Sequence, residues 1–291
     1  MDMTKNKCCR RGANLRRRRR RRRKILRSII FSCSIIAVAV FVAVGSSMIR
    51  SGDGRTNRYD VEAGNNTYDN AVIENSKISE KNKIQNNQSM LDDIMNSTQY
   101  PKQLKDLALK NEEALEFVYD YPAEHVKEHT IDLTEEASMD SVPLFVQWDK
   151  RWGYEKYSGN FFAASGCGTT TLSMVVVYLT HNREASPIAV AKYSKEAGYS
   201  VDGSGSSWTL ISEGCMHYGV KAKSVALDES RMKAELDEGH PIVVNVGPGD
   251  FTDTGHFMVI TGYDDEGFSI NDPNSIEKSG KRWLFKNISS Q

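Results

Sequence analysis

Residues 165–175 have the sequence SGCGTTTLSMV, which places Cys167 between two glycines at the predicted start of a helix. Apolar residues follow it at helical spacing: Leu172, Val175, Val176 and Leu179. Threonines suit a helix start, although the valines would also fit a buried strand over residues 172–179. In a helix, free N–H groups and the positive end of the dipole stabilise a thiolate in the first turn. Cys167 is therefore a candidate nucleophile.

A histidine and an aspartate further along the chain could activate this thiol. A thiol attacks a carbonyl as the thiolate, so the chemistry needs a base and a polar group that orients the base. His256 and Asp272 have the right side chains for these two roles. Predicted strands over residues 256–263 and 268–271 form a hairpin that brings both residues toward its open end. A symmetric turn would leave them about three residues, roughly 10 Å, out of register, so their contact requires a stagger or twist of the strands.

Each of these residues also has a structural interpretation. Of the five cysteines, only Cys167 and Cys215 lie beyond residue 50, and in an oxidising compartment they could form a disulfide. His256 could be a core histidine, and Asp272 could cap the turn before a proline. The side chains of Cys167, His256 and Asp272 could also bind zinc, but the close-spaced ligand pairs typical of zinc sites are absent. We therefore expect no metal and no cofactor.

The first 50 residues differ sharply in charge from the rest. They carry 15 Lys or Arg and one acidic residue, a net charge of +14, so residues 51–291 carry −14 because the whole chain is neutral. Residues 28–49 contain no charged side chain over 22 positions, which is enough helix to cross a bilayer. The basic flank predicts that residues 1–27 stay in the cytoplasm and that the rest lies outside the cell membrane.

This N-terminal region has two other interpretations. Ala43-Val44-Gly45 offers small residues where a signal peptidase could cut, which would give a secreted protein. The arginine block at residues 16–23 could instead be a nucleic-acid-binding tail, but its place beside the apolar run favours membrane topology. The acidic balance of the remaining chain argues against a nucleic-acid partner.

The rest of the chain divides into three parts. Residues 50–88 are polar with few large apolar side chains, which predicts a flexible linker. Residues 89–140 contain short segments with helical spacing and predict a helical lead-in that packs on a domain at residues 141–291. Within that domain we expect an extended segment at 142–148, helices at 187–198, 208–218 and 229–238, and a strand at 241–246.

Four stretches together resemble the papain-like cysteine peptidases that process bacteriocin leaders after a double glycine: SGCGTTTLSMV, GPGDFTDTGHFMVITGY, NDPNS and, upstream, VPLFVQWDKRWG. The resemblance covers residues 142–274, under half of the chain. It implies an α+β, papain-like fold in which a helical half carries the cysteine and an antiparallel sheet carries the histidine and aspartate. It also implies that Cys167 is the nucleophile, His256 the base and Asp272 its orienting partner, and that Gln147 helps to form the oxyanion hole.

The sequence departs from this family in two respects. Thr169 stands where the resemblance implies a proline, although both residue types suit a first helical turn. The family's best-known members are domains of export transporters, and this chain has no nucleotide-binding loop. The double-glycine leader is therefore not carried over as its substrate.

Together these features predict a membrane-anchored, extracytoplasmic cysteine peptidase that acts on a peptide or protein. Two alternatives remain: a peptidoglycan amidase or endopeptidase that uses the same cysteine and histidine, and a catalytically silent peptide-binding module. Four aromatic residues are candidates for a peptide-binding cleft or for the core: Trp148, Trp152, Trp208 and Phe251.

Overall fold

A computed structural model describes residues 66–291, with side chains from residue 79 onward. The chain divides into two units, Met1–Thr67 and Tyr68–Gln291, and the features below belong to the second unit. The predicted membrane span at residues 28–49 lies outside the described part. Within residues 66–291, no helix is both long and apolar enough to cross a bilayer.

Helices form the first part of the described chain. In chain order they are α2 (Asn66–Asn96), α3 (Lys102–Lys110), the 3-10 helix η1 (Glu112–Ala114), α4 (Leu115–Tyr119), α5 (Tyr121–Glu124) and α6 (Thr134–Ser138). The predicted flexible linker over residues 50–88 differs from the structure from Asn66 onward, where the chain is helical. No glycine or proline interrupts residues 66–96, and the buried Ile94 ties the end of α2 to the lead-in.

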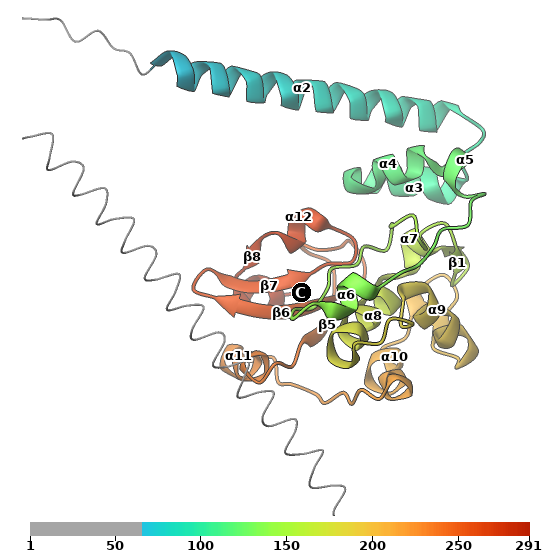
Figure 1. The fold of residues 1–291 in the computed structure, drawn as a ribbon, viewed down its shortest axis with the longest axis vertical. Coiled ribbons are helices and arrows are strands. Elements are labelled where there is room, and N and C mark those ends of the chain that lie inside the picture. Colours follow the sequence, from blue (N-terminus) through green and yellow to red (C-terminus); the bar gives the residue numbers. More distant parts are fainter. Residues whose placement is uncertain (1–65) are drawn as a thin grey trace, which may run out of the picture. The chain divides into compact units, whose positions relative to one another are not determined.

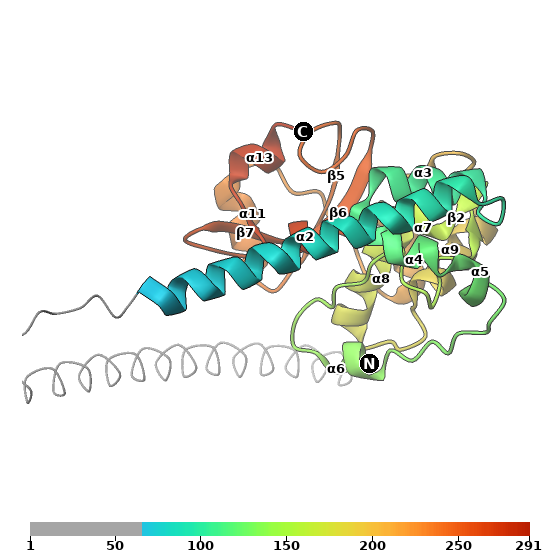
Figure 2. The same ribbon diagram turned by 90° about the horizontal axis from the view of Figure 1, so that it is seen from above.

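The lead-in, residues 89–140, shares a hydrophobic core with the segment that precedes Cys167. Leu104, Leu115 and Phe117 of the lead-in pack in one cluster with Phe161 and Ala163. In Figure 2, α3 and α4 lie beside β2 (Asn160–Phe161) and α7 (Phe162–Ser165). The predicted packing of the lead-in on the following domain therefore occurs through buried apolar side chains.

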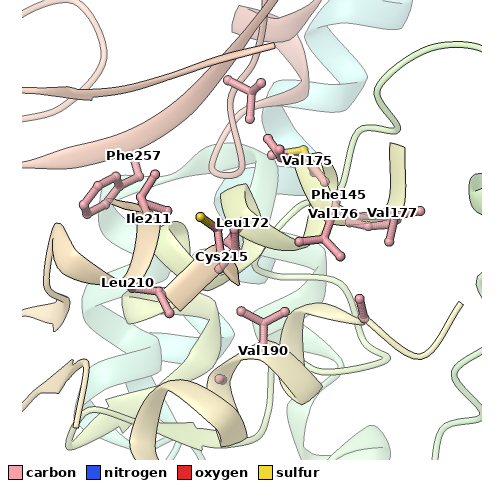
Figure 3. Packing of buried hydrophobic residues seen from close by; sticks show 14 of the residues in the cluster. Phe145, Leu172, Val175, Val176, Val177, Val190, Leu210, Ile211, Cys215 and Phe257 are labelled. Carbon is pink, nitrogen blue, oxygen red and sulfur yellow. The ribbon is translucent and has the colours of Figure 1, made fainter. Parts of the chain in front are cut away.

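The helical half of the domain is centred on α8 (Cys167–Thr180), so the predicted helix is confirmed and the strand alternative is wrong. α8 is buried along most of its length, and Leu172, Val175 and Val176 belong to the largest hydrophobic cluster (Figure 3). Tertiary packing therefore outweighs the weak helix propensity of its valines. The other elements of this half are β1 (Lys156–Tyr157), α9 (Pro187–Glu196), β3 (Ser200–Val201), β4 (Gly205–Ser206), α10 (Thr209–Ser212) and η2 (Gly214–Tyr218).

The second half contains an antiparallel sheet in the order β5-β6-β7-β8 (Figure 1). Its strands are β5 (Ile242–Val246), β6 (His256–Asp264), β7 (Gly267–Asn271) and β8 (Arg282–Trp283), and its helices are α11 (Glu229–Asp237), α12 (Ile276–Ser279) and α13 (Phe285–Ser289). Strand alternation separates the two sides of β6. Phe257 and Val259 pack in the cluster of α8, whereas Met258 and Ile260 pack in a second cluster that includes Met232 of α11.

Candidate active site

Cys167 is the first residue of α8, where backbone N–H groups point toward the start of the helix. Gly166 precedes it, and the N–H of Thr170 donates to the Gly166 carbonyl oxygen at 2.9 Å. The Thr169 hydroxyl donates to the same oxygen at 3.0 Å. Threonine thus stabilises this first turn where the resemblance implied a proline. The thiol sits at the positive end of a 14-residue helix.

The two glycines around Cys167 are required by close packing. A Cβ atom at position 166 would lie 2.5 Å from the Phe162 ring, and one at position 168 would lie 2.8 Å from the Ser206 Cβ. Both distances are shorter than side-chain carbon atoms tolerate. The residues flanking Cys167 therefore have to be glycine for the chain to turn into α8 between Phe162 and β4.

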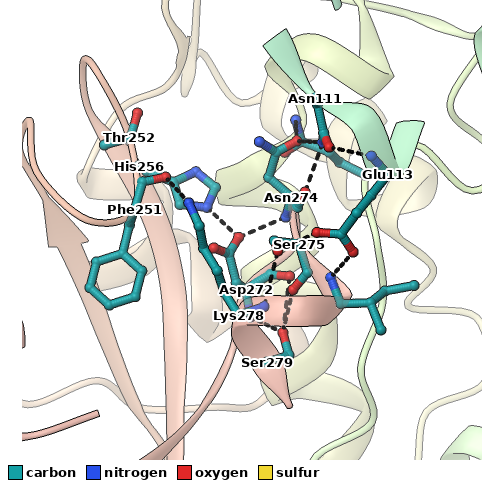
Figure 4. Close-up of polar contacts among 12 residues, drawn as sticks. Asn111, Glu113, Phe251, Thr252, His256, Asp272, Asn274, Ser275, Lys278 and Ser279 are labelled. Atoms are coloured by element: carbon teal, nitrogen blue, oxygen red, sulfur yellow. Dashed lines mark hydrogen bonds and ion pairs between the residues drawn. The ribbon is translucent and has the colours of Figure 1, made fainter. Parts of the chain in front are cut away.

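His256 and Asp272 form a buried, hydrogen-bonded pair (Figure 4). The distance from His256 Nε2 to Asp272 Oδ1 is 2.7 Å, and the two side chains are 8% and 1% exposed. This contact occupies Nε2, so Nδ1 is the ring nitrogen left for another partner. The Cys167 thiol lies close enough to His256 for each side chain to shift the pKa of the other. The structure therefore brings Cys167, His256 and Asp272 together in one connected group.

A β-bulge at Thr261 explains how the histidine and aspartate meet. Near the turn Gly262 pairs with Ser269, but beyond the bulge Ile260 pairs with Ile270, so no residue of β7 is paired with Thr261 in the strand register. Continued along the strands, this register places Asp272 opposite position 258, two residues from His256 and on the same face of the sheet. A symmetric hairpin would pair Thr261, keep the offset at three residues and turn Asp272 to the other face, so the bulge is the stagger that the sequence required.

The surroundings of Cys167 favour its charged form. Burial is the largest single influence and works to raise the pKa of the thiol, whereas hydrogen bonding to His256 and the positive imidazole nearby lower it. Hydrogen bonds from the backbone of Phe257 and Gly168 add to this effect. The pKa of Cys167 therefore lies below its ordinary value, and a thiolate is favoured.

His256 is shifted in the opposite direction. Burial alone would lower the pKa of its imidazole, but the hydrogen bond to Asp272 and the interactions with the Cys167 sulfur raise it from 6.5 to about 10. The two opposite shifts both favour an ion pair of thiolate and imidazolium. The two titrations are coupled, because each charge stabilises the other.

With this geometry established, comparison with known proteins gives one match. The model of the Peptidase_C39 like family matches residues 139–290. The chain belongs to this family. No curated protein matches the chain, and no solved structure matches it. Membership of the C39-like peptidase family suggests peptidase activity and, with it, a peptide or protein substrate. The matched region contains Gln147, Cys167, His256 and Asp272.

In the C39-like domain, Gln147 is buried and its side chain makes two contacts. Its Nε2 donates to the Ala163 carbonyl oxygen at 2.7 Å and, more weakly, to Asn274 Oδ1 at 3.3 Å. Its backbone N–H donates to the Pro273 carbonyl oxygen at 2.7 Å. Both side-chain protons are thus engaged, and donation to a substrate oxygen requires the weaker contact with Asn274 to be exchanged.

Of the four aromatic candidates, one is exposed in the C39-like domain. Trp152 and Phe251 are buried in hydrophobic clusters, and Trp148 is partly buried with its indole N–H donating to the Asn274 carbonyl oxygen at 3.3 Å. Trp208 is 48% exposed and stacks on Phe257, with ring centroids 5.6 Å apart. The Phe257 ring lies against Gly168, where a Cβ atom would be 3.3 Å away, so Trp208 stacks on a ring beside the turn that carries Cys167.

Disulfide formation with Cys215 and zinc binding are the two structural alternatives for the Cys167 thiol. Cys167 and Cys215 are both free thiols, and Cys215 is buried in the hydrophobic cluster around α8. Among residues 66–291, no group of three or more His, Cys, Asp and Glu side chains could hold a metal ion.

Asn274 of the NDPNS stretch contacts the site although no signal in the sequence marks it as functional. Its backbone N–H donates to Asp272 Oδ1 at 2.8 Å, the same oxygen that accepts from His256. The Asp272 N–H in turn donates to Ser279 Oγ at 2.9 Å. The segment that follows Asp272 therefore holds both its backbone N–H and its carboxylate.

Proposed function

We propose that this chain is a cysteine peptidase in which Cys167, His256 and Asp272 form a catalytic triad. The observation that carries the proposal is the buried 2.7 Å contact between His256 and Asp272, with the Cys167 thiol interacting with the same imidazole. Membership of the C39-like family supports a peptide bond as the target. The nucleophile, its acid–base partner and the group that orients this partner are all present in one buried cluster.

In the first half of the reaction, the Cys167 thiolate attacks the carbonyl carbon of a peptide bond. The C–S bond forms while the carbonyl oxygen takes up negative charge. The imidazolium of His256 then gives its proton to the leaving amine nitrogen, the C–N bond breaks, and a thioester remains. The backbone N–H of Cys167 and the side chain of Gln147 are the donors that we assign to the oxyanion, at roughly 3–4 kcal/mol for each donor.

In the second half, water hydrolyses the thioester. Neutral His256 accepts a proton from the water as its oxygen attacks the carbonyl carbon, and the C–S bond then breaks to release the carboxylic acid and the thiolate. The imidazolium and thiolate are restored together, so no further proton donor is needed. Asp272 keeps Nε2 of the ring engaged throughout and thereby directs Nδ1 at the sulfur and the substrate.

The test compares the two described thiols in the full chain. Cys167→Ala is expected to abolish peptide hydrolysis, measured with a peptide library and mass spectrometry, while Cys215→Ala retains it. With iodoacetamide at pH 7, Cys167 is expected to react much faster than Cys215, since burial raises the pKa of Cys215. Equal and slow labelling of both thiols, or hydrolysis by the alanine variant at position 167, contradicts the proposal.

We further propose that residues 28–49 anchor the chain in the membrane and that the C39-like domain faces outward. The support is the uncharged run next to the basic block at residues 16–23. Protease added to intact cells is expected to degrade the domain while the N-terminal segment stays protected. Recovery of the full-length chain, untouched by protease, from the soluble fraction of lysed cells contradicts this topology.

A further inference from the structure

Two polar side chains of the lead-in reach the segment that carries Asp272. They are Asn111, which precedes η1, and Glu113 within η1. We call residues 272–277, which follow β7, the acid loop. In Figure 4, Asn111 and Glu113 lie against this loop on the side opposite His256. The lead-in lies before the region matched by the C39-like family, residues 139–290.

Asn111 contacts Asn274 through two hydrogen bonds. Its Nδ2 donates to the Asn274 carbonyl oxygen at 2.9 Å and to the Asn274 Oδ1 at 3.0 Å. Its own Oδ1 accepts from the Glu113 N–H at 3.0 Å, which fixes the orientation of the amide. One side chain therefore holds both the backbone and the side chain of the residue that donates to Asp272.

Glu113 binds the next three residues of the acid loop. One of its carboxylate oxygens, Oε2, accepts from the N–H groups of Ile276 at 2.7 Å and Glu277 at 3.1 Å. The other oxygen accepts a hydrogen bond from the Ser275 hydroxyl. Hydrogen bonds to an ionised carboxylate are stronger than neutral ones, so Glu113 ties down this part of the loop.

These contacts connect directly to the histidine. The N–H of Asn274 donates to Asp272 Oδ1, and that oxygen accepts from His256 Nε2. A displacement of Asn274 or Ser275 therefore moves the carboxylate that holds the imidazole. Because His256 also contacts Cys167, the interaction runs from the lead-in through the acid loop to the thiol.

The lead-in itself is firmly attached to the domain. The Phe117 and Tyr154 rings stack with centroids 4.2 Å apart, and the Tyr154 hydroxyl donates to the Phe117 carbonyl oxygen at 2.8 Å. Lys150 and Asp120 form an ion pair at 2.5 Å. The lead-in thus gives Asn111 and Glu113 a fixed base from which to hold the loop.

We propose that Asn111 and Glu113 are positioning residues that keep Asp272 aligned with His256, so that the working peptidase begins in the lead-in and not at the start of the C39-like domain. This inference rests on the proposed function, because it concerns the same triad. Neither residue touches the reacting atoms. Both act through Asn274 and Ser275, and their effect is therefore expected on the turnover step and on the thiol.

The first experiment measures kcat and KM of the full chain with Glu113→Ala and Asn111→Ala. Each variant is expected to lower kcat roughly ten- to hundredfold with little change in KM, since small misalignments of catalytic groups have effects of this size. Glu112→Ala is the matched control, because Glu112 is the neighbour of Glu113 in η1 and also carries a carboxylate. It is exposed and accepts a hydrogen bond from the half-buried Asn87 of α2 at 2.7 Å. Unchanged kcat in both Glu113→Ala and Asn111→Ala overturns the proposal.

The second experiment follows alkylation of Cys167 by iodoacetamide against pH. Loss of alignment weakens the support of Asp272 for the imidazolium, so the midpoint of the Glu113→Ala profile is expected to move to higher pH, while Glu112→Ala keeps the native midpoint. A purely structural role of Glu113 would lower the melting temperature without moving this midpoint, and that result overturns the proposal. If the native chain itself shows no fast Cys167 labelling, the proposed function fails; if it does and Glu113→Ala matches it, only this inference fails.

A double-variant comparison separates positioning from general weakening. In a chain that already carries Asp272→Ala, adding Glu113→Ala is expected to lower kcat no further, because residues that act through one another are not additive. A full additional loss in the double variant overturns the proposal.

Glu113→Gln keeps an acceptor oxygen for the loop N–H groups and remains folded if the alanine variant does not. It is expected to retain more activity than Asn111→Ala, and an equal or lower kcat contradicts the assigned contacts.

Discussion

The region around Cys167 and the region around Asp272 contact the same imidazole but are built by different means. Cys167 is placed by one helix, by packing against its two neighbouring glycines and by the hydrophobic cluster beneath α8. Asp272 is placed by a strand irregularity and by side chains from more than 160 positions away, since Asn111 and Asn274 are 163 positions apart. Cys167 thus stands at the start of one helix that apolar packing holds in place, whereas Asp272 depends on a register shift and on polar contacts from far along the chain.

The strongest way to break the connection between the two regions is to remove the residue they share. His256→Ala is expected to lower kcat/KM by roughly 10²–10⁴-fold, the range for loss of a positioned acid–base group. Burial then acts on Cys167 without the opposing imidazole, so the pKa of the thiol rises. Iodoacetamide labelling of Cys167 at pH 7 should become slow, in parallel with the loss of hydrolysis.

Combining His256→Ala with Asp272→Asn tests whether Asp272 acts through the imidazole. Because Asp272 acts through His256, adding Asp272→Asn to His256→Ala should change kcat/KM little, whereas Asp272→Asn alone should lower it in the native chain. His240→Ala is a suitable control, since His240 is half-exposed and contacts Glu235 on α11, away from the site. Equal losses at positions 240 and 256 would argue against a special role for His256.

Outside the plateau of the pH profile, kcat/KM is expected to change about tenfold for each pH unit. One limb of the profile reports on Cys167 and the other on His256. The pKa of Cys167 is lowered, so kcat/KM should rise as the thiolate forms at a pH below the ordinary 9.0 of a thiol. The pKa of His256 is raised to about 10, so kcat/KM should fall as the imidazolium loses its proton near that pH. Asp272→Asn removes the charge behind the imidazole and is expected to move the alkaline limb to lower pH.

The same contrast decides how much of the site could be predicted from sequence. The start of α8 at Cys167, the hairpin around Gly267 and the lead-in helix α3 follow from local spacing and turn residues, and the structure has them. The family resemblance then supplied the roles of the residues. Local pattern was sufficient wherever the determining interactions lie within one element.

Long-range features were predicted less well. The bulge that brings Asp272 onto the face of His256 left one signal, the glycine at position 262 inside a predicted strand, where glycine is typical of bulges. The contacts of Asn111 and Glu113 with the acid loop left none, because nothing in a single sequence links residues so far apart. The helix at residues 66–88 was missed because its polar composition resembles that of a flexible linker.

The smallest effect is expected from the bulge residue itself, and it sharpens the comparison. Deleting Thr261 leaves the pairs on both sides unchanged, Ile260 with Ile270 and Gly262 with Ser269, so Asp272 keeps its place relative to His256. We expect kcat within a few-fold of native and a loss of stability of about 1–3 kcal/mol as the strand repacks, measured by hydrolysis and urea unfolding. Thr261→Ala, which keeps the extra residue, is the control. If the deletion abolished activity while the chain stayed folded, the register alone would not account for the alignment of Asp272, and the local twist of the bulge would have to contribute as well.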